Sequence, residues 1–328
     1  MSNTEDKNIR NQRNREEQGI PKWAFVAVLG VILAVIVFSV VKLWIWNQGT
    51  AETEGVVEGD FSVEVMDQIF LLPEDKKAMH EDDGQETILF LGNDILTYYS
   101  NEEGVVEQIG SKLGANCINA GFPASTVALK NAEYTDDYAL DAFSFVSVAK
   151  AIANRDFSQM ASAAQKFEDS NYDNHTETLE ALDMNSVDTL VIFYDAQDYI
   201  NLRIGMNPDN DSDPLTYSGA LNAGIKTIQE AYPFIRIVCM SFPMCYAYDN
   251  TGSLVNGDMY DFGNGRLTTY LQFMIDVSGA TGVSFVDNYY GTIHEDNSSE
   301  WLLDNIHVNA ACNKHMAEHF AKVIYGVE

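Results

Sequence analysis

Four short polar segments carry side chains that could do chemistry, and each lies beside an apolar run. They are residues 92–94 (Gly-Asn-Asp), 119–122 (Asn-Ala-Gly-Phe), 194–198 (Tyr-Asp-Ala-Gln-Asp) and 304–307 (Asp-Asn-Ile-His). Carboxylates and an imidazole can together bind a metal ion, and Asp94, Asp304 and His307 are the candidates for such a cluster. Taken singly, each segment also fits an ordinary role as a turn, a helix start or a helix cap.

The elements that must position these segments follow a strand–helix alternation. Apolar runs predict buried strands at 88–91, 115–118, 189–193, 235–240 and 283–286. Helical patterns occupy 104–113, 138–153, 157–166, 176–182, 218–231, 266–278 and 309–324. The alternation predicts an α/β three-layer sandwich with a five-stranded parallel sheet, whose carboxyl edge would hold the polar segments. Residues 122–186 are long for one crossover, so we predict a helical insertion beside the site.

The beginning of the chain predicts one transmembrane segment. Residues 23–46 contain the uncharged run WAFVAVLGVILAVIVFSVV and have tryptophans at both ends. At about 1.5 Å per residue, such a helix crosses a hydrocarbon core of about 30 Å. The alternatives are a buried helix of a soluble domain and a cleaved signal peptide, whose apolar core is usually shorter.

The charges that flank this segment predict its orientation. Five Lys and Arg residues precede it, whereas the ten residues 51–60 contain acidic side chains and no basic one. The positive-inside rule therefore predicts a cytoplasmic tail at 1–22 and a cell-membrane anchor at 23–46. An extracytoplasmic spacer at 47–84 and the main extracytoplasmic domain at 85–328 would follow.

The composition narrows the partners and cofactors. With 19 Lys and Arg against 49 Asp and Glu, the net charge is −30, which argues against nucleic acid as a partner. The four cysteines form no Cys-x-x-Cys pair, so no zinc site is predicted, although a disulfide stays open. The oxygen-rich loop at 207–213 lacks the spacing of a calcium-binding EF-hand and is interpreted as a solvated loop. We therefore predict no metal and no cofactor.

In this order and with these strand contexts, the four segments resemble the SGNH (GDSL-type) hydrolase family. That family has Gly-Asp-Ser after its first strand, a glycine after the second, Gly-x-Asn-Asp after the third and Asp-x-x-His before the last helix. The resemblance covers about residues 86–325, and 231–233 (Ala-Tyr-Pro) with the run after them also resembles the family's fourth strand. The long insertion is similar to that of membrane-anchored members from anaerobic Gram-positive bacteria. The resemblance implies a flavodoxin-like SGNH fold.

The resemblance also implies ester hydrolysis or acyl transfer, in which a serine attacks the carbonyl and a histidine, oriented by an aspartate, takes its proton. It implies that His307 is the base, that Asp304 orients it and that Gly121 supplies a backbone N–H to the oxyanion. The chain departs from the family at two signature positions. Asp94 stands where the attacking serine is expected, and Gln197 stands where the family has its oxyanion asparagine.

Asp94 separates two hypotheses on function. A carboxylate there would repel the developing oxyanion, at a place where losing one donor already costs about 3–4 kcal/mol. We expect it to form an ion pair with His307 and keep the histidine protonated. Asp195 also replaces a glycine of the family pattern. Ser100 and Ser125 are the candidates for a substitute nucleophile, but neither directly follows a strand. One hypothesis is a cell-surface ester hydrolase or acyltransferase acting on acylated glycans or envelope polymers. The other is an inactive relative that binds a glycan or protein partner through the former cleft.

Overall fold

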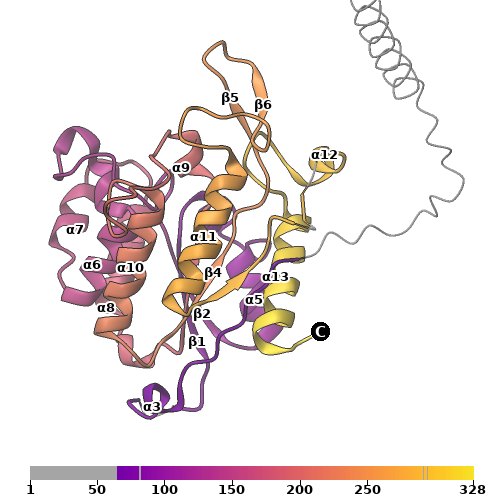
Figure 1. The fold of residues 1–328 in the computed structure, drawn as a ribbon. Helices are drawn as coiled ribbons and strands as arrows, with labels where there is room; N and C mark the ends of the chain where they lie inside the picture. Colours follow the sequence, from indigo (N-terminus) through magenta and orange to yellow (C-terminus); the bar gives the residue numbers. More distant parts are fainter. Residues whose placement is uncertain (1–64, 81–82, 291, 294) are drawn as a thin grey trace, which may run out of the picture. The chain divides into compact units, whose positions relative to one another are not determined.

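The computed structural model describes residues 65–80, 83–290, 292–293 and 295–328 (Figure 1). Its centre is a five-stranded sheet in the order β2-β1-β3-β4-β7, in which every neighbouring pair runs parallel. The strands are β1 (Thr87–Gly92), β2 (Asn116–Gly121), β3 (Thr189–Phe193), β4 (Arg236–Met240) and β7 (Ser284–Val286). The predicted five-stranded parallel sheet is confirmed, and all five predicted strands are present.

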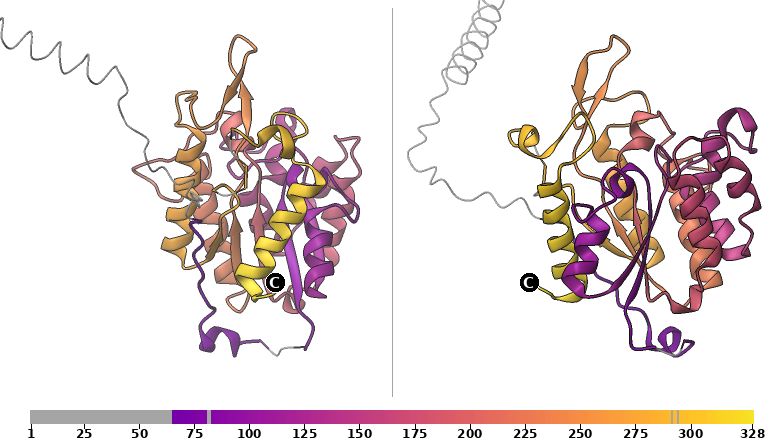
Figure 2. Two further views of the ribbon diagram at one scale, coloured as in Figure 1. Left: turned by 90° about the vertical axis from the view of Figure 1, so that its right-hand side faces the viewer. Right: turned by 180° about the vertical axis from the view of Figure 1, so that it is seen from behind.

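Helices cover both faces of this sheet, which gives the three predicted layers (Figures 1 and 2). On one face, α5 and α13 lie side by side; on the other lie α8, α10 and α11, with α6 packed against α10 and α7 against α8. The long helices are α5 (Val105–Leu113), α6 (Phe145–Asn154), α7 (Ser158–Ala164), α8 (Asn171–Ala181), α10 (Tyr217–Ala231), α11 (Leu267–Thr281) and α13 (Ala310–Tyr325). The short ones are α3 (Glu74–Lys77), α4 (Asp94–Thr97), α9 (Gln197–Ile200) and α12 (Ser298–Trp301), with 3-10 turns η1 (Asp136–Phe143) and η2 (Met184–Ser186).

The junction between β1 and α4 brings the first polar segment to the carboxyl edge of the sheet. All six residues of β1 are buried, as its apolar sequence predicts. At Gly92, an added Cβ would lie 1.9 Å from the carbonyl oxygen of Phe193 and 2.6 Å from Cδ1 of Leu96. Only glycine permits this close approach of β1 to β3 and α4, so the chain can turn directly into Asp94.

The predicted insertion at 122–186 contains η1, α6, α7, α8 and η2. The helix predicted at 138–153 is interrupted at Ser144, whose side chain accepts a hydrogen bond from the Ser147 N–H and caps α6. A two-stranded antiparallel hairpin, β5 (Tyr246–Tyr248) with β6 (Leu254–Asn256), was not predicted. Figure 1 places this hairpin at the same end of the sheet as α9 and α12.

Residues 66–70, which we call the strap, lie along the outer edge of β7 although the sequence assigns them to the spacer. Gln68 and Phe285 exchange two backbone hydrogen bonds of 2.9 and 2.7 Å in an antiparallel bridge. The Met66 N–H donates to Oδ2 of Asp287 at 2.9 Å. The strap therefore belongs to the folded domain, because it pairs with edge groups that a terminal strand would otherwise leave open.

The predicted cytoplasmic tail (1–22) and anchor (23–46) lie outside the described residues, as does the spacer up to residue 64. Among the residues that the structure describes, no helix is both long and apolar enough to span a membrane. The tail, the anchor and the orientation therefore stay predictions from the sequence.

Candidate active site

A small pocket lies where the segments after β1 and β3 meet the segment before α13. Asp94, Asp195 and His307 line it, together with Tyr98 and Tyr99. Its volume is about 10 Å³, roughly the room that one water molecule needs. The structure therefore brings two of the predicted site residues, Asp94 and His307, to one place.

The Asp94 carboxylate is bound by the loop that follows β2. Its Oδ2 accepts a hydrogen bond of 2.7 Å from the backbone N–H of Ala124. Ala124 has a φ of 55°, in the left-handed region that residues other than glycine rarely adopt. Burial raises the pKa of Asp94, while the Ala124 N–H and the charge of His307 oppose that rise.

Helix α8 of the insertion braces this loop. The Tyr172 hydroxyl donates to the Pro123 carbonyl at 2.5 Å, and Nδ1 of His175 is 2.6 Å from the carbonyl oxygen of Gly121. Burial lowers the pKa of His175 although the Gly121 carbonyl opposes this, and because a carbonyl only accepts, Nδ1 carries the proton. The insertion thus fixes the backbone that presents the Ala124 N–H.

The predicted pairing of Asp304 with His307 is present. Oδ2 of Asp304 lies 2.6 Å from Nδ1 of His307, and its Oδ1 accepts the backbone N–H groups of Ile306 at 2.9 Å and of His307 at 2.8 Å. Burial acts to raise the pKa of Asp304, but these hydrogen bonds outweigh it and hold the pKa below its ordinary value. Asp304 therefore orients the imidazole, which leaves Nε2 as the nitrogen available for proton transfer.

Tyr98 stacks on the imidazole of His307, with ring centroids 4.3 Å apart and an angle of 22° between the planes. Asp94 and His307 share the pocket, yet within the described residues they form neither a hydrogen bond nor an ion pair. The predicted direct pair is therefore not formed. The two groups interact through their charges only, as the lowering effect of His307 on the pKa of Asp94 indicates.

Asn93 and Asp195 form a reciprocal pair beneath the pocket. Nδ2 of Asn93 donates to Oδ1 of Asp195 at 2.7 Å and also to the Ser125 carbonyl at 2.9 Å. The Asp195 N–H donates to Oδ1 of Asn93 at 2.9 Å. Burial, reinforced by the charge of Asp94, raises the pKa of Asp195 far above its ordinary value. Asn93 and Asp195 therefore satisfy each other's hydrogen-bonding groups in the buried layer next to the pocket.

Gly121 is near the site, but its N–H is not directed into it. That N–H donates to Oδ1 of Asn119 at 3.0 Å. A Cβ on Gly121 would lie 2.8 Å from Cβ of Leu96 and 3.0 Å from Cγ2 of Thr97, so the glycine makes room for α4. The donor that reaches Asp94 is Ala124, which could not be recognised from the sequence because an alanine at positive φ leaves no signal in composition or spacing.

Gln197 begins α9, and its side chain does not line the pocket. Its Oε1 accepts a hydrogen bond of 2.9 Å from Nδ2 of Asn201, one helical turn later. Its N–H donates to Oδ1 of Asp195 at 3.1 Å, so its backbone supports the neighbouring carboxylate. The Gln197 side chain, one methylene longer than that of asparagine, thus makes its hydrogen bond within α9.

Among the described residues, neither Ser100 nor Ser125 takes the place of the serine nucleophile that the family pattern has at position 94, and no metal centre does. Ser125 is 1% exposed, whereas Ser100 is exposed and does not line the pocket. No three His, Cys, Asp or Glu side chains within the described ranges are arranged to hold a metal ion. All four cysteines are free. The pocket can therefore place an oriented histidine beside a carboxyl group, but it presents no alcohol or thiol.

Comparison with known proteins gives structural matches only. No family model and no curated protein matches the chain. One solved chain superposes with a TM-score of 0.54 at 18% identity, covering 75% of this chain and 99% of its own. A protein from Lactobacillus plantarum has a TM-score of 0.50 at 14% identity, covering 74% and 97% respectively. A carbohydrate acetylesterase from Sinorhizobium meliloti has a TM-score of 0.44 at 13% identity, covering 73% and 97%.

At these identities the matches establish the fold. The sheet order is that of the flavodoxin-like type, and the polar segments after β1 and β3 meet the segment before α13 at the carboxyl edge, as the family pattern requires. The domain described here has the flavodoxin-like three-layer α/β fold that the resemblance to the SGNH (GDSL-type) hydrolases implies.

Proposed function

We propose that this chain is a cell-surface protein whose SGNH-type domain binds an envelope polymer without hydrolysing it. The observation that carries the proposal is the 2.7 Å hydrogen bond from the Ala124 N–H to Asp94. A backbone N–H beside the attacking group stabilises the oxyanion in acyl transfer. Here a carboxyl oxygen of the chain itself accepts that hydrogen bond, so the donor is not free for a substrate.

The chemistry of a carboxylate nucleophile supports the same conclusion. If Asp94 attacked an ester carbonyl, the tetrahedral intermediate would have to expel an alkoxide to form a mixed anhydride. A carboxylate is a far better leaving group than an alkoxide, so the intermediate would collapse back to the ester. When Asp94 is protonated it is a still weaker nucleophile. Neither the ionised nor the protonated form of Asp94 therefore leads to a productive acyl-enzyme.

Ester hydrolysis or acyl transfer on an acylated glycan is the second candidate, and the Asp304–His307 pair favours it. The 2.6 Å contact holds His307 as a general base would be held, and the pocket has room for about one water molecule. In this case His307 would activate a water directly, without an acyl-enzyme.

The location is part of the proposal. The uncharged run within 23–46 and the Lys and Arg residues before it support a single-pass anchor with its N-terminus in the cytoplasm. The folded domain would then face the envelope, where its partner would be a glycan or another surface polymer.

The test is hydrolysis of p-nitrophenyl acetate by the full-length chain purified in detergent. We expect the wild type and a His307→Ala variant to be equally slow. Turnover by the wild type that exceeds buffer and falls at least about a hundredfold on His307→Ala would replace the binding proposal with the hydrolase.

A further inference from the structure

A cluster of ionisable side chains fixes the strap both to the sheet and to α13. Oδ1 of Asp67, in the strap, accepts a hydrogen bond of 2.8 Å from the N–H of Asp287, the residue after β7. Nε2 of His319, on α13, lies 3.1 Å from each of the two carboxylate oxygens of Asp67. The three residues come from separate parts of the chain, so the cluster is complete only while the strap lies on β7.

The strap brings one acid against another. Asp287 is 1% exposed, and its Oδ2 accepts the hydrogen bond from the Met66 N–H. Burial raises the pKa of Asp287 and the charge of Asp67 adds to that rise, whereas the charge of His319 opposes it. The imidazole of His319 therefore lies where a positive charge would offset two neighbouring carboxylates.

The surroundings of His319 let its charge respond to pH. Its side chain and that of Asp67 are each 21% exposed, so water reaches the pair. On α13 itself, His315 lies one turn earlier, and the exposed side chains of Glu318 and Lys322 carry opposite charges. Burial, reinforced by the charge of His319, lowers the pKa of His315, so His315 binds a proton less readily than an ordinary histidine.

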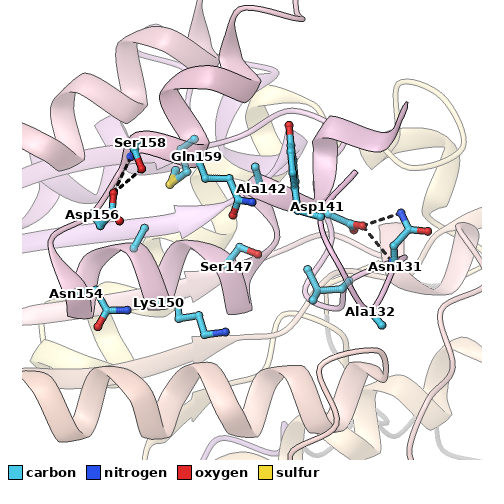
Figure 3. A pocket seen from close by; sticks show the side chains of 14 residues that line it. Asn131, Ala132, Asp141, Ala142, Ser147, Lys150, Asn154, Asp156, Ser158 and Gln159 are labelled. Atoms are coloured by element: carbon cyan, nitrogen blue, oxygen red, sulfur yellow. Dashed lines mark hydrogen bonds between the residues drawn. The ribbon is translucent and has the colours of Figure 1, made fainter. Parts of the chain in front are cut away.

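The carboxylates around the larger pocket of the insertion, which has a volume of about 310 Å³, are bound differently (Figure 3). Asp141 accepts hydrogen bonds of 3.0 Å from the backbone N–H and from Nδ2 of Asn131. Asp156 accepts the N–H of Ser158 at 3.1 Å and its hydroxyl at 2.6 Å. These donors stay neutral near pH 7, whereas a histidine changes its charge between about pH 5 and 8. A response to pH is therefore expected at the strap.

We propose that Asp67 and His319 form a pH-sensitive latch, which holds the strap on β7 in mildly acidic solution and loosens it as the pH rises toward about 8. Protonated His319 pairs with Asp67 and offsets the charge of Asp287. Since the docked strap favours the protonated imidazole, protonation in turn favours docking. This contribution is present below a pH of about 6 and is lost as the pH rises.

Release of the strap would change the reach of the domain. The residues of the strap, 66–70, would add up to about 17 Å, at about 3.4 Å per residue, to the segment that leads back to the anchor predicted at 23–46. The latch acts on this segment and not on the Asp94 pocket, so it operates whether or not that pocket cleaves an ester.

The experiment is hydrogen–deuterium exchange of the full-length chain in detergent at pH 5.5 and at pH 8, with each rate compared with the intrinsic rate at that pH. The N–H groups of Gln68 and Phe285, which join the strap to β7, are followed by mass spectrometry with fragmentation to single residues. We expect their protection to be about threefold to tenfold lower at pH 8, relative to that of β1 in the same samples. The reference to β1 separates release of the strap from unfolding of the whole domain.

His319→Gln keeps a side chain that can donate to Asp67 but cannot become charged, so it removes the difference between the two pH values. Asp67→Asn also removes it, although its amide oxygen can still accept the Asp287 N–H. The matched control is His315→Gln, one turn earlier on the same helix, which keeps the difference. Thermal unfolding confirms that each variant is folded. The proposal is overturned if strap protection in the wild type is equal at both pH values, whether high or absent, or if folded His319→Gln keeps the wild-type difference.

Discussion

The backbone N–H of Ala124 donates a hydrogen bond of 2.7 Å to Oδ2 of Asp94. A backbone donor and a side-chain acceptor of the same chain therefore satisfy each other. The arrangement satisfies the backbone donor of a left-handed residue. The first prediction follows from releasing it.

We expect Asp94→Ser to create or raise ester hydrolysis. The substitution removes the competing carboxyl, frees the Ala124 N–H and places a hydroxyl beside His307. General-base assistance by His307 contributes about 10²–10⁴-fold, so adding His307→Ala should abolish the gain. Asp94→Asn is the control, because it removes the charge without supplying a nucleophile. The rate is measured with p-nitrophenyl acetate, and a wild type already as fast as Asp94→Ser would contradict the prediction.

The Asn93–Asp195 pair predicts compensation between two substitutions. Asn93→Asp alone places a second buried acid against Asp195 and against the Ser125 carbonyl, so it should destabilise the domain by at least about 2 kcal/mol. Asp195→Asn added to it restores a donor and should recover about 0.5–3 kcal/mol as coupling energy. Urea unfolding of both single variants and the double variant measures this cycle. Strict additivity would show that the two side chains do not act as a pair.

Gly92→Ala should destabilise the domain by about 3 kcal/mol or more, because its Cβ would lie 1.9 Å from a backbone oxygen that cannot move away freely. Gly279→Ala is the matched control. Its Cβ would meet only Oε1 of Gln68 at 3.7 Å, and it lies in α11, where alanine is favoured over glycine by about 0.5–1 kcal/mol. Opposite shifts in the urea midpoint are expected. Equal shifts would contradict the packing at the end of β1.

Asp198 predicts a dependence of stability on pH. Its carboxylate accepts the N–H groups of Val127 at 2.7 Å and Ala128 at 3.0 Å, yet burial raises its pKa to about 6. A group whose pKa is raised on folding binds its proton more tightly in the folded state. Protonated Asp198 therefore contributes to the free energy of unfolding below a pH of about 4. This contribution, of up to about 3 kcal/mol, is lost as the pH rises toward 6.

The check is urea unfolding between pH 4 and 7 on the wild type and Asp198→Asn. The variant cannot accept both N–H groups equally well, so it should be less stable overall, but its stability should fall less steeply over this interval. Parallel profiles would show that Asp198 titrates alike in both states.

The parallel sheet could be predicted because its central strands β1 and β3 contain apolar runs that are buried throughout, with helical patterns between the strands. The Asp304–His307 pair was expected from the resemblance to the SGNH family, and the two side chains can meet because they lie within one short segment. The donor to Asp94 could not be predicted, because the position of the Ala124 N–H depends on a left-handed backbone conformation and on the bracing by Tyr172 and His175 from a distant helix. Nor could the loss of Gln197 from the site, since it depends on a hydrogen bond within α9.

The strap has a mechanical consequence. Its bonds to the sheet edge follow one another along the chain, from Met66 with Asp287 to Phe70 with Ser284. Tension applied through the preceding residues would load the bond at Met66 first, so the strap would peel away stepwise while the rest of the sheet stayed intact. Peeling would turn β7 into an open edge, which is the surface on which an extended segment of another protein can add as a new strand.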